Sequence, residues 1–175
     1  KPDILKLVDS ELKSWWSLPG HPHPSIVLVW SALLTLAKKP SAQEHALHAS
    51  QAHALSSLAS VSSSDGLSET AAVVACTVVF SAASAVLTAF GLNPLTMAEH
   101  AVDDIVTLLT NAFKGDALLC EHFQAGLLHE KDVVGVKYMP VHAFVDSLAA
   151  LFPASHAPLL RILSAVCGNG GGGGG

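Results

Sequence analysis

Charged side chains are scarce in this sequence of 175 residues. Only 13% of its residues are Asp, Glu, Lys or Arg, while 50% are hydrophobic, and a soluble domain usually carries about 25% charged residues. So little charge cannot cover the surface of a lone soluble domain. We therefore expect other protein to cover part of it, either flanking segments of a longer chain or the neighbours in an assembly. The apolar content suffices for the core of one domain or of part of a larger one.

Basic residues and cysteines are also few. Nine Lys and Arg residues stand against 14 Asp and Glu, for a formal net charge of -5. No basic patch is available to neutralise a phosphate backbone, which argues against direct nucleic-acid binding. The three cysteines, Cys76, Cys120 and Cys167, are odd in number and far apart. They predict no disulfide framework and point to a reducing compartment. Residues 1–20 lack the apolar stretch of a signal peptide.

Motifs for catalysis are missing as well. There is no Gly-x-Ser-x-Gly elbow, and the glycines at 170–175 follow no strand and precede no helix, unlike a phosphate-binding loop. Cys76 and Cys167 lie in apolar helical surroundings and are predicted to be core residues. The adjacent Asp103 and Asp104 are predicted to lie on a solvated helix face. We therefore expect no enzyme, no catalytic or cofactor-binding residue, and no small-molecule substrate.

The ten histidines raise the question of a metal site. His45 and His48 are three residues apart and could share a helix face, but His53 projects elsewhere and no carboxylate completes a ligand set. The zincin motif needs Glu after its first His, whereas Glu44 precedes His45 here. We predict a solvated, His-rich face and no metal ligand.

Helical periodicity recurs along the chain with no convincing strand between the helices. Apolar stripes bounded by Pro, Gly and capping residues predict helices over 3–17, 24–39, 41–61, 68–90, 96–114, 141–152 and 158–167. A short turn of helix is predicted at 116–122, and 123–140 is predicted to be a long loop. Capping boxes are expected at Ser41 with Glu44 and at Thr96 with Glu99.

Seven or eight helices joined mostly by short loops predict an all-α fold. Consecutive helices so joined tend to pack antiparallel, and stacked pairs form a superhelix. We predict an α-solenoid segment of stacked antiparallel helix pairs, with degenerate repeats of the HEAT type, over residues 1–169. Residues 170–175 are predicted to be a poly-Gly low-complexity tail. No fixed repeat period is visible, which argues against tetratricopeptide or ankyrin arrays. A closed helical bundle is the alternative architecture, and both ends of the sequence are expected to be cuts through a longer protein.

Residues 71–92 carry no charge and are numerous enough to span a bilayer. Ala, Ser and Thr dilute this run, and its nearest lysines are Lys39 and Lys114, so no cationic flank orients it. We predict a buried central helix of the solenoid, whose small residues let neighbouring helices approach closely, and no membrane span. A membrane protein anchored by 71–92 is the competing hypothesis.

Two blocks carry a resemblance to a known family. The sequence PSIVLVWSALL at 24–34 resembles the NP-x-LLAWALL helix of the large inner-ring scaffold nucleoporins, the nucleoporin 188 and nucleoporin 205 family. The sequence VDSLAALFP at 145–153, followed by APLLRIL at 157–163, looks like the LDS-x-x-x-(M/L)FP and SPLL-x-LL-x-AL pair of the nucleoporin 188 branch. The resemblance covers residues 24–169 in register. The terminal glycines and the Ala-, Ser- and His-rich helices depart from the animal members.

This resemblance implies a structural component of the inner ring of the nuclear pore complex, located at the nuclear envelope and supporting nucleocytoplasmic transport. The implied partners are other nucleoporins, in particular a linker nucleoporin, and flanking solenoid segments of the same chain. No partner-binding motif falls in the matched blocks, so no contact residue is carried over. The alternative function is a helical-repeat adaptor that binds a protein or peptide outside the pore. Its groove would need exposed ladders, whereas Trp15, Trp16 and Trp30 are predicted to lie in the core.

Overall fold

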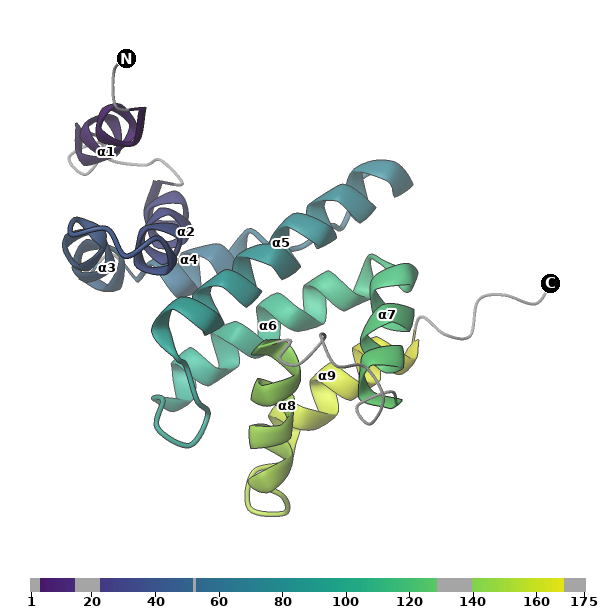
Figure 1. The fold of residues 1–175 in the computed structure, drawn as a ribbon. Helices are drawn as coiled ribbons and strands as arrows, with labels where there is room; N and C mark the ends of the chain where they lie inside the picture. The colour runs from purple at the N-terminus through teal and green to yellow at the C-terminus, as the bar shows by residue number, and fades with distance from the viewer. Residues whose placement is uncertain (1–3, 15–22, 52, 129–139, 169–175) are drawn as a thin grey trace.

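A computed structural model describes residues 4–14, 23–51, 53–128 and 140–168 (Figure 1). Within these ranges the chain forms nine α-helices and no strand, which confirms the predicted all-α class. The helices are α1 (Ile4–Ser14), α2 (His23–Leu36), α3 (Ala42–Gln51), α4 (Ala54–Ser60), α5 (Glu69–Phe90), α6 (Glu99–Lys114), α7 (Ala117–Leu128), α8 (Pro140–Ala150) and α9 (Ala157–Gly168). The poly-Gly tail predicted at 170–175 lies outside the described residues.

The glycines that follow α5 and α6 end these helices where the sequence predicts. Gly91 has a φ of 56° and its N–H donates to the carbonyl of Leu87, so it is the left-handed C-cap of α5. Gly115 caps α6 after Lys114. These boundaries are correct because a glycine after a long periodic stripe is a strong local signal.

Three predicted boundaries are wrong. The helix predicted to run to Lys39 ends at Leu36, and Lys38 beyond it adopts the left-handed conformation with a φ of 53°. The stretch 41–61 is not one helix, because His53 adopts the left-handed conformation with a φ of 49° and separates α3 from α4. Residues 123–128, predicted to be a loop, continue α7. Phe123 is fully buried against Phe113, with ring centroids 4.9 Å apart, and this tertiary contact holds the helix past its weak local signal.

The capping box predicted at Thr96 and Glu99 is also wrong. The N-cap of α6 is Ala98, and no side chain there accepts a capping hydrogen bond. The hydroxyl of Thr96 instead donates to the carbonyl of Asn93, at 3.2 Å. Asn93 also accepts the N–H of Leu95 with its side chain, at 2.9 Å, so the polar residues here build the turn before the helix.

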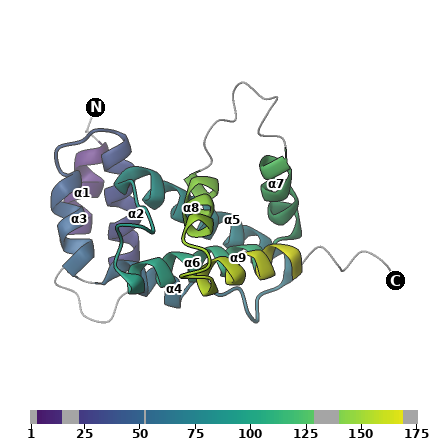
Figure 2. The same ribbon diagram turned by 90° about the horizontal axis from the view of Figure 1, so that it is seen from below.

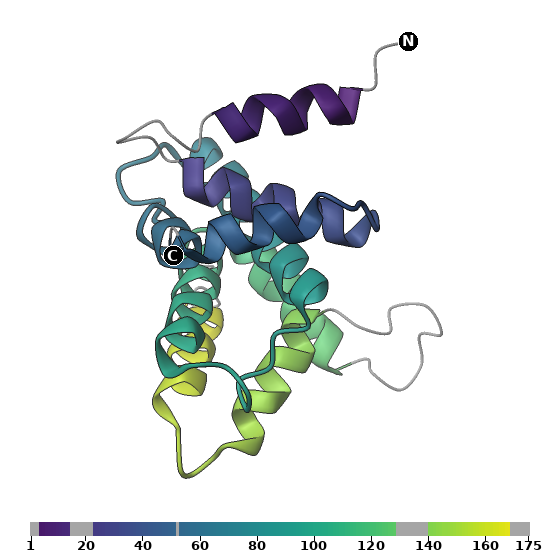
Figure 3. The ribbon, with the colours of Figure 1, turned by 90° about the vertical axis from the view of Figure 1, so that its left-hand side faces the viewer.

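The described helices pack in an order that the connectivity does not reveal by itself. Besides its sequence neighbour α3, α2 contacts α4 and α5; α5 contacts α6 and α8; and α6 contacts α4 and α9. Seen from below, α1, α2 and α3 gather at one end of the molecule, α7 and the end of α9 lie at the other, and α8 lies between them (Figure 2). Figure 3 shows α4, α6 and α9 in one column and α5 and α8 in a second column beside it.

Helix α6 lies at the centre of the core. Its apolar stripe is confirmed, and six of its side chains are completely buried: Ile105, Val106, Leu108, Leu109, Ala112 and Phe113. The ring of Phe113 also contacts Phe80 of α5, with centroids 5.8 Å apart. The stripe predicted from the 3.6-residue period therefore faces helices on several sides at once.

Helix α5 is buried over only part of its length. Its second half packs into the core through Ala83, Val86 and Leu87. In its first half, Val74 is 59% and Val78 61% exposed. Figure 1 shows these first turns at the outer end of the helix, away from α2 and α8. The prediction of a buried central helix therefore holds only for the second half.

Candidate functional site

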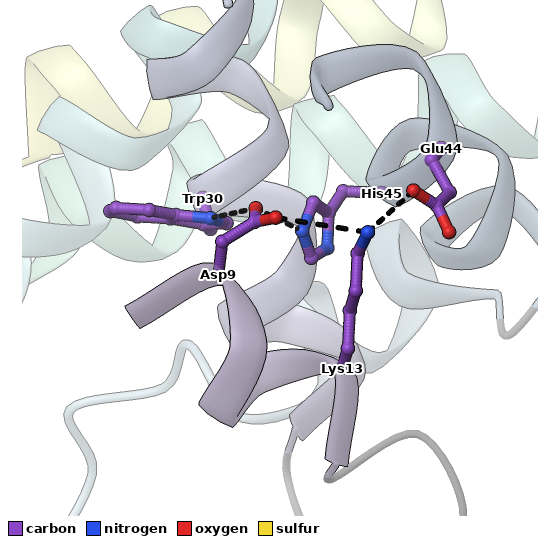
Figure 4. Close-up of polar contacts among 5 residues, drawn as sticks. All are labelled: Asp9, Lys13, Trp30, Glu44 and His45. Carbon is purple, nitrogen blue, oxygen red and sulfur yellow. Dashed lines mark hydrogen bonds and ion pairs between the residues drawn. The ribbon is translucent and has the colours of Figure 1, made fainter. Parts of the chain in front are cut away.

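A cluster of polar side chains joins three helices near the N-terminus (Figure 4). We call Asp9, Lys13, Trp30, Glu44 and His45 the Asp9 cluster. Asp9 of α1 accepts hydrogen bonds from Nε2 of His45, at 2.7 Å, and from Nε1 of Trp30, at 3.5 Å. Nζ of Lys13 lies 2.6 Å from the carboxylate of Glu44 and 3.7 Å from that of Asp9. The cluster thus connects α1 to both α2 and α3.

The hydrogen bonds of the cluster stabilise the charged form of Asp9. Burial alone raises the pKa of this carboxyl, but the hydrogen bonds from His45 and Trp30 outweigh burial and hold the pKa below its usual value. The hydrogen bond to Glu44 raises the pKa of Lys13. An ionised carboxylate accepts but cannot donate, so Nε2 of His45 carries the proton in its contact with Asp9.

The Asp9 cluster is built to hold helices together. His45 is completely buried, so a substrate has no route to its ring. Leu12, one turn beyond Asp9, is buried on the same helix and adds an apolar contact. The cluster therefore fastens α1 to α2 and α3.

The predicted solvated histidine face is wrong for His45, which is buried and bonded to Asp9. His48 is half-buried, and only His53 is exposed as predicted. Across the part of the chain that the structure describes, no three His, Cys, Asp or Glu side chains come together as a possible metal site.

Cysteines and tryptophans divide between confirmed and corrected predictions. Cys76 is buried as predicted, but Cys167 is exposed because it lies on the outer face of α9. Within the described residues none of the three cysteines forms a disulfide. Trp30 is half-buried and donates to Asp9, while Trp15 and Trp16 lie outside the described residues.

The acidic pair of α6 lies toward the surface and makes contacts to neighbouring helices. Asp103 is exposed and forms an ion pair with Arg161 of α9. Asp104 accepts a hydrogen bond from the hydroxyl of Ser56 of α4, at 2.6 Å. The two carboxylates therefore reach toward opposite neighbours, and they do not form a catalytic pair.

A groove with a volume of about 740 Å³ lies between α6 and α9. It is lined by Thr110, Asn111, Lys114, His156, Ala157, Leu160, Arg161, Ser164, Ala165 and Gly168. Its described walls thus include two cations and an imidazole and no carboxylate, and one of the cations, Arg161, is already paired with Asp103. Sequence reasoning missed this groove, because its two walls are more than 40 residues apart in the chain and no motif connects them.

The comparisons with known proteins give no relative. No family model, no curated protein and no solved structure matches this chain. Function is therefore inferred from the helix arrangement, the surface and the two sequence blocks.

Proposed function

We propose that this chain is a segment of an α-solenoid scaffold in the inner ring of the nuclear pore complex, related to the nucleoporin 188 and nucleoporin 205 family. Its role is structural: stacked helix pairs bury a continuous core and hold a defined curvature. In this proposal a linker nucleoporin and the flanking segments of the same chain cover the apolar side chains that are exposed on this segment.

One observation supports the proposal of a solenoid most strongly. Helices α4, α6 and α9 lie side by side and run in the same direction. Ser56, in the first turn of α4, bonds Asp104 of α6, and Ser62, two residues beyond the end of α4, bonds Asn111 of α6, so the contacts follow the same order along both segments. Arg161, in the first half of α9, bonds Asp103 in the first half of α6 and Thr107 at its middle. Helices repeated by translation along a solenoid have this common direction, whereas neighbours in an up-down bundle alternate.

A second row accompanies the first. Helix α5 contacts α2 on one side and α8 on the other. Each of these helices also contacts one member of the first row, which groups them as α2 with α4, α5 with α6, and α8 with α9. The thiol of Cys76 on α5 lies 3.7 Å from the carbonyl of Asn111, late in α6, so the first half of one helix lies beside the end of the other. In this scheme α3 is an insertion between the two helices of the first pair, and α7 is an insertion between the second and third pairs.

The two family-like blocks fall at corresponding places in this arrangement. Residues 24–34 belong to α2 in the first pair, and residues 145–163 contain most of α8 and the first half of α9 in the third pair. The resemblance therefore involves helices of both outer pairs. This placement supports the proposed family, because the architecture of a solenoid constrains the identity of the residues that pack between its helix pairs.

The surface supports a role inside an assembly. Large apolar side chains are exposed on α1, α2, α3, α5, α7 and α9, including Leu7, Leu33, Leu47, Val74 and Leu160. With 13% charged residues, the chain has few side chains to keep these areas solvated. A scaffold segment covered by its neighbours needs no such protection.

The location of the whole protein in cells tests the pore assignment. A fluorescent tag on the endogenous gene product should give a continuous nuclear rim that coincides with pore markers. A diffuse cytosolic signal would overturn the pore assignment and favour an adaptor that binds protein partners elsewhere.

The proposal of a scaffold segment covered by neighbours has its own test in the purified chain of 175 residues. We expect it to self-associate and to bind a dye specific for apolar surface, and a monomer that binds no dye would contradict a segment covered by neighbours.

A further inference from the structure

We propose that the groove between α6 and α9 binds a short acidic, amphipathic peptide segment of a partner protein. The proposal rests on the lining of this groove and does not depend on membership of the nuclear pore. It adds a specific docking site to a chain whose proposed role is otherwise mechanical.

The charge of the groove favours an anionic ligand. Lys114 and Arg161, two of only nine Lys and Arg residues in a chain with net charge -5, line it together with His156. Lys114 is exposed and takes part in no ion pair among the described residues. Asp103 and Thr107 bond the two terminal nitrogens of Arg161 and fix its position, so Lys114 is the cation most available to a ligand.

The apolar part of the groove favours a ligand that also carries an apolar side chain. Leu160 is 53% exposed and lies in the groove beside Ala157 and Ala165. A peptide that places an aliphatic side chain over Leu160 and a carboxylate near Lys114 would satisfy both kinds of surface. The volume of about 740 Å³ lies within the usual range of ligand pockets, about 300–1,000 Å³.

The shape of the groove suits a helical segment. The groove runs along α9, whose 12 residues span about 18 Å at the usual helical rise, and it meets only the last turns of α6, through Thr110, Asn111 and Lys114. At the end of α9, a Cβ added to Gly168 would meet none of the described residues within 4 Å. An amphipathic helix of about three turns can lie along such a groove with its apolar face inward.

A buried hydroxyl in the wall of the groove is a second, independent sign of an absent polar ligand. Thr110 is 7% exposed, and its Oγ1 has no hydrogen-bond partner within the described residues. A buried hydroxyl without a partner loses its hydrogen bonds to water and gains none in return. A carboxylate or carbonyl of a bound peptide could accept this hydrogen bond after a small rotation of the threonine side chain. Nucleic acid fits the groove less well, because its phosphates need a longer row of cations than Lys114 and Arg161 provide.

The test is fluorescence polarisation with the purified chain and a fluorescein-labelled helical peptide of Glu and Leu, with leucines on one face. We expect saturable binding that weakens as salt rises. Lys114→Gln should weaken binding roughly tenfold, equivalent to about 1.4 kcal/mol. Leu160→Ala should weaken it to a similar extent, and Gly168→Phe should block the groove at the end of α9 with no change of charge.

Matched variants far from the groove separate docking from general attraction. Lys39→Gln removes the same charge beyond the end of α2, and Leu47→Ala removes an exposed leucine from α3. Both should bind the peptide like the original chain. The proposal is overturned if the peptide does not bind, if Lys39→Gln weakens binding as much as Lys114→Gln, or if a peptide with Gln in place of Glu binds equally well. Binding to vesicles of anionic phospholipid but not to the peptide would assign the groove to lipid headgroups and would also overturn it. Circular dichroism and thermal unfolding of each variant verify that it is folded.

Discussion

The carboxylate of Asp9 lies 2.7 Å from Nε2 of His45, although the two residues are 36 positions apart in the chain. His45 is completely buried, and Asp9 is the side chain that reaches it from α1. The attachment of the first helix thus depends on a charge that titrates, which makes it measurable by changing the pH.

Asp9→Asn should lower the free energy of unfolding by about 1–2 kcal/mol at neutral pH, because hydrogen bonds to a charged group are lost. The pKa of Asp9 is lowered in the folded chain from its ordinary value of 3.8. Its stabilising contribution is therefore complete above 3.8 and is lost as the pH falls through the lower, folded-state value. Chemical unfolding from neutral to strongly acidic pH should show the two proteins converging at the acid end. Asp146→Asn, on an exposed part of α8, is the control, and its free energy of unfolding should equal that of the original chain across the same pH range.

Phe113→Ala should destabilise the chain by about 3–5 kcal/mol, since the ring is completely buried and a cavity would replace it. Phe152→Ala removes the same atoms from a side chain that is 61% exposed, and should change stability by less than about 0.5 kcal/mol. Denaturant midpoints measure both effects. Equal effects of the two substitutions would contradict the central position of α6.

Gly91→Ala should cost about 1–2 kcal/mol, because an alanine at a φ of 56° has a strained left-handed backbone. No atom lies within 4 Å of the added methyl group, so the cost would come from the backbone alone. Gly168→Ala is the matched substitution, with equal space but a helical backbone, and should be neutral or slightly stabilising. Thermal unfolding of the pair would refute this account if Gly91→Ala were the milder change.

Gly115→Ala should be destabilising for a different reason. Its new methyl group would overlap Sγ of Cys76 and would lie 2.7 Å from Oγ of Ser64. We expect a cost of about 1–3 kcal/mol, the usual effect of overpacking. Combining it with Cys76→Ala should cost less than the two single variants added together, by at least about 0.5 kcal/mol. Strict additivity in this double-mutant cycle would show that the sulfur is not the obstacle.

The double variant Val74→Ser and Val78→Ser should reduce dye binding and self-association and leave the unfolding free energy within about 0.5 kcal/mol of the original. Both side chains are mostly exposed on the first half of α5, so the folded chain loses little packing.

The same helix has 22 residues, and its most apolar window is only 28% buried, so its length and composition would also permit a membrane span. Carbonate extraction of the expressed chain should release it into the soluble fraction. Retention in the membrane pellet would contradict the expectation of no membrane span.

Local signals in the sequence were sufficient for the helices with strong periodicity or clear ends. The stripe of α6 and the glycine after α5 determine those elements through interactions within a few residues. The break at His53 was not predictable, because the apolar spacing of α3 and α4 is compatible with a continuous helix and no Gly or Pro separates them.

Contacts between distant residues were beyond sequence reasoning. The burial of His45 depends on Asp9, and the groove depends on Arg161 lying beside Asp103, 58 positions away. Composition also overestimated the burial of α5, since it says nothing about the length of the neighbouring helices. α8 has half the length of α5 and cannot cover both of its ends.

The common direction of α4, α6 and α9 has a mechanical consequence. Their contacts run sideways, through Ser56, Asn111 and Arg161, and not through the loops that connect them. A pull along this row would load two side-chain interfaces in series, α4 against α6 and α6 against α9. We therefore expect such a pull to shift the helices against one another before it unfolds any of them.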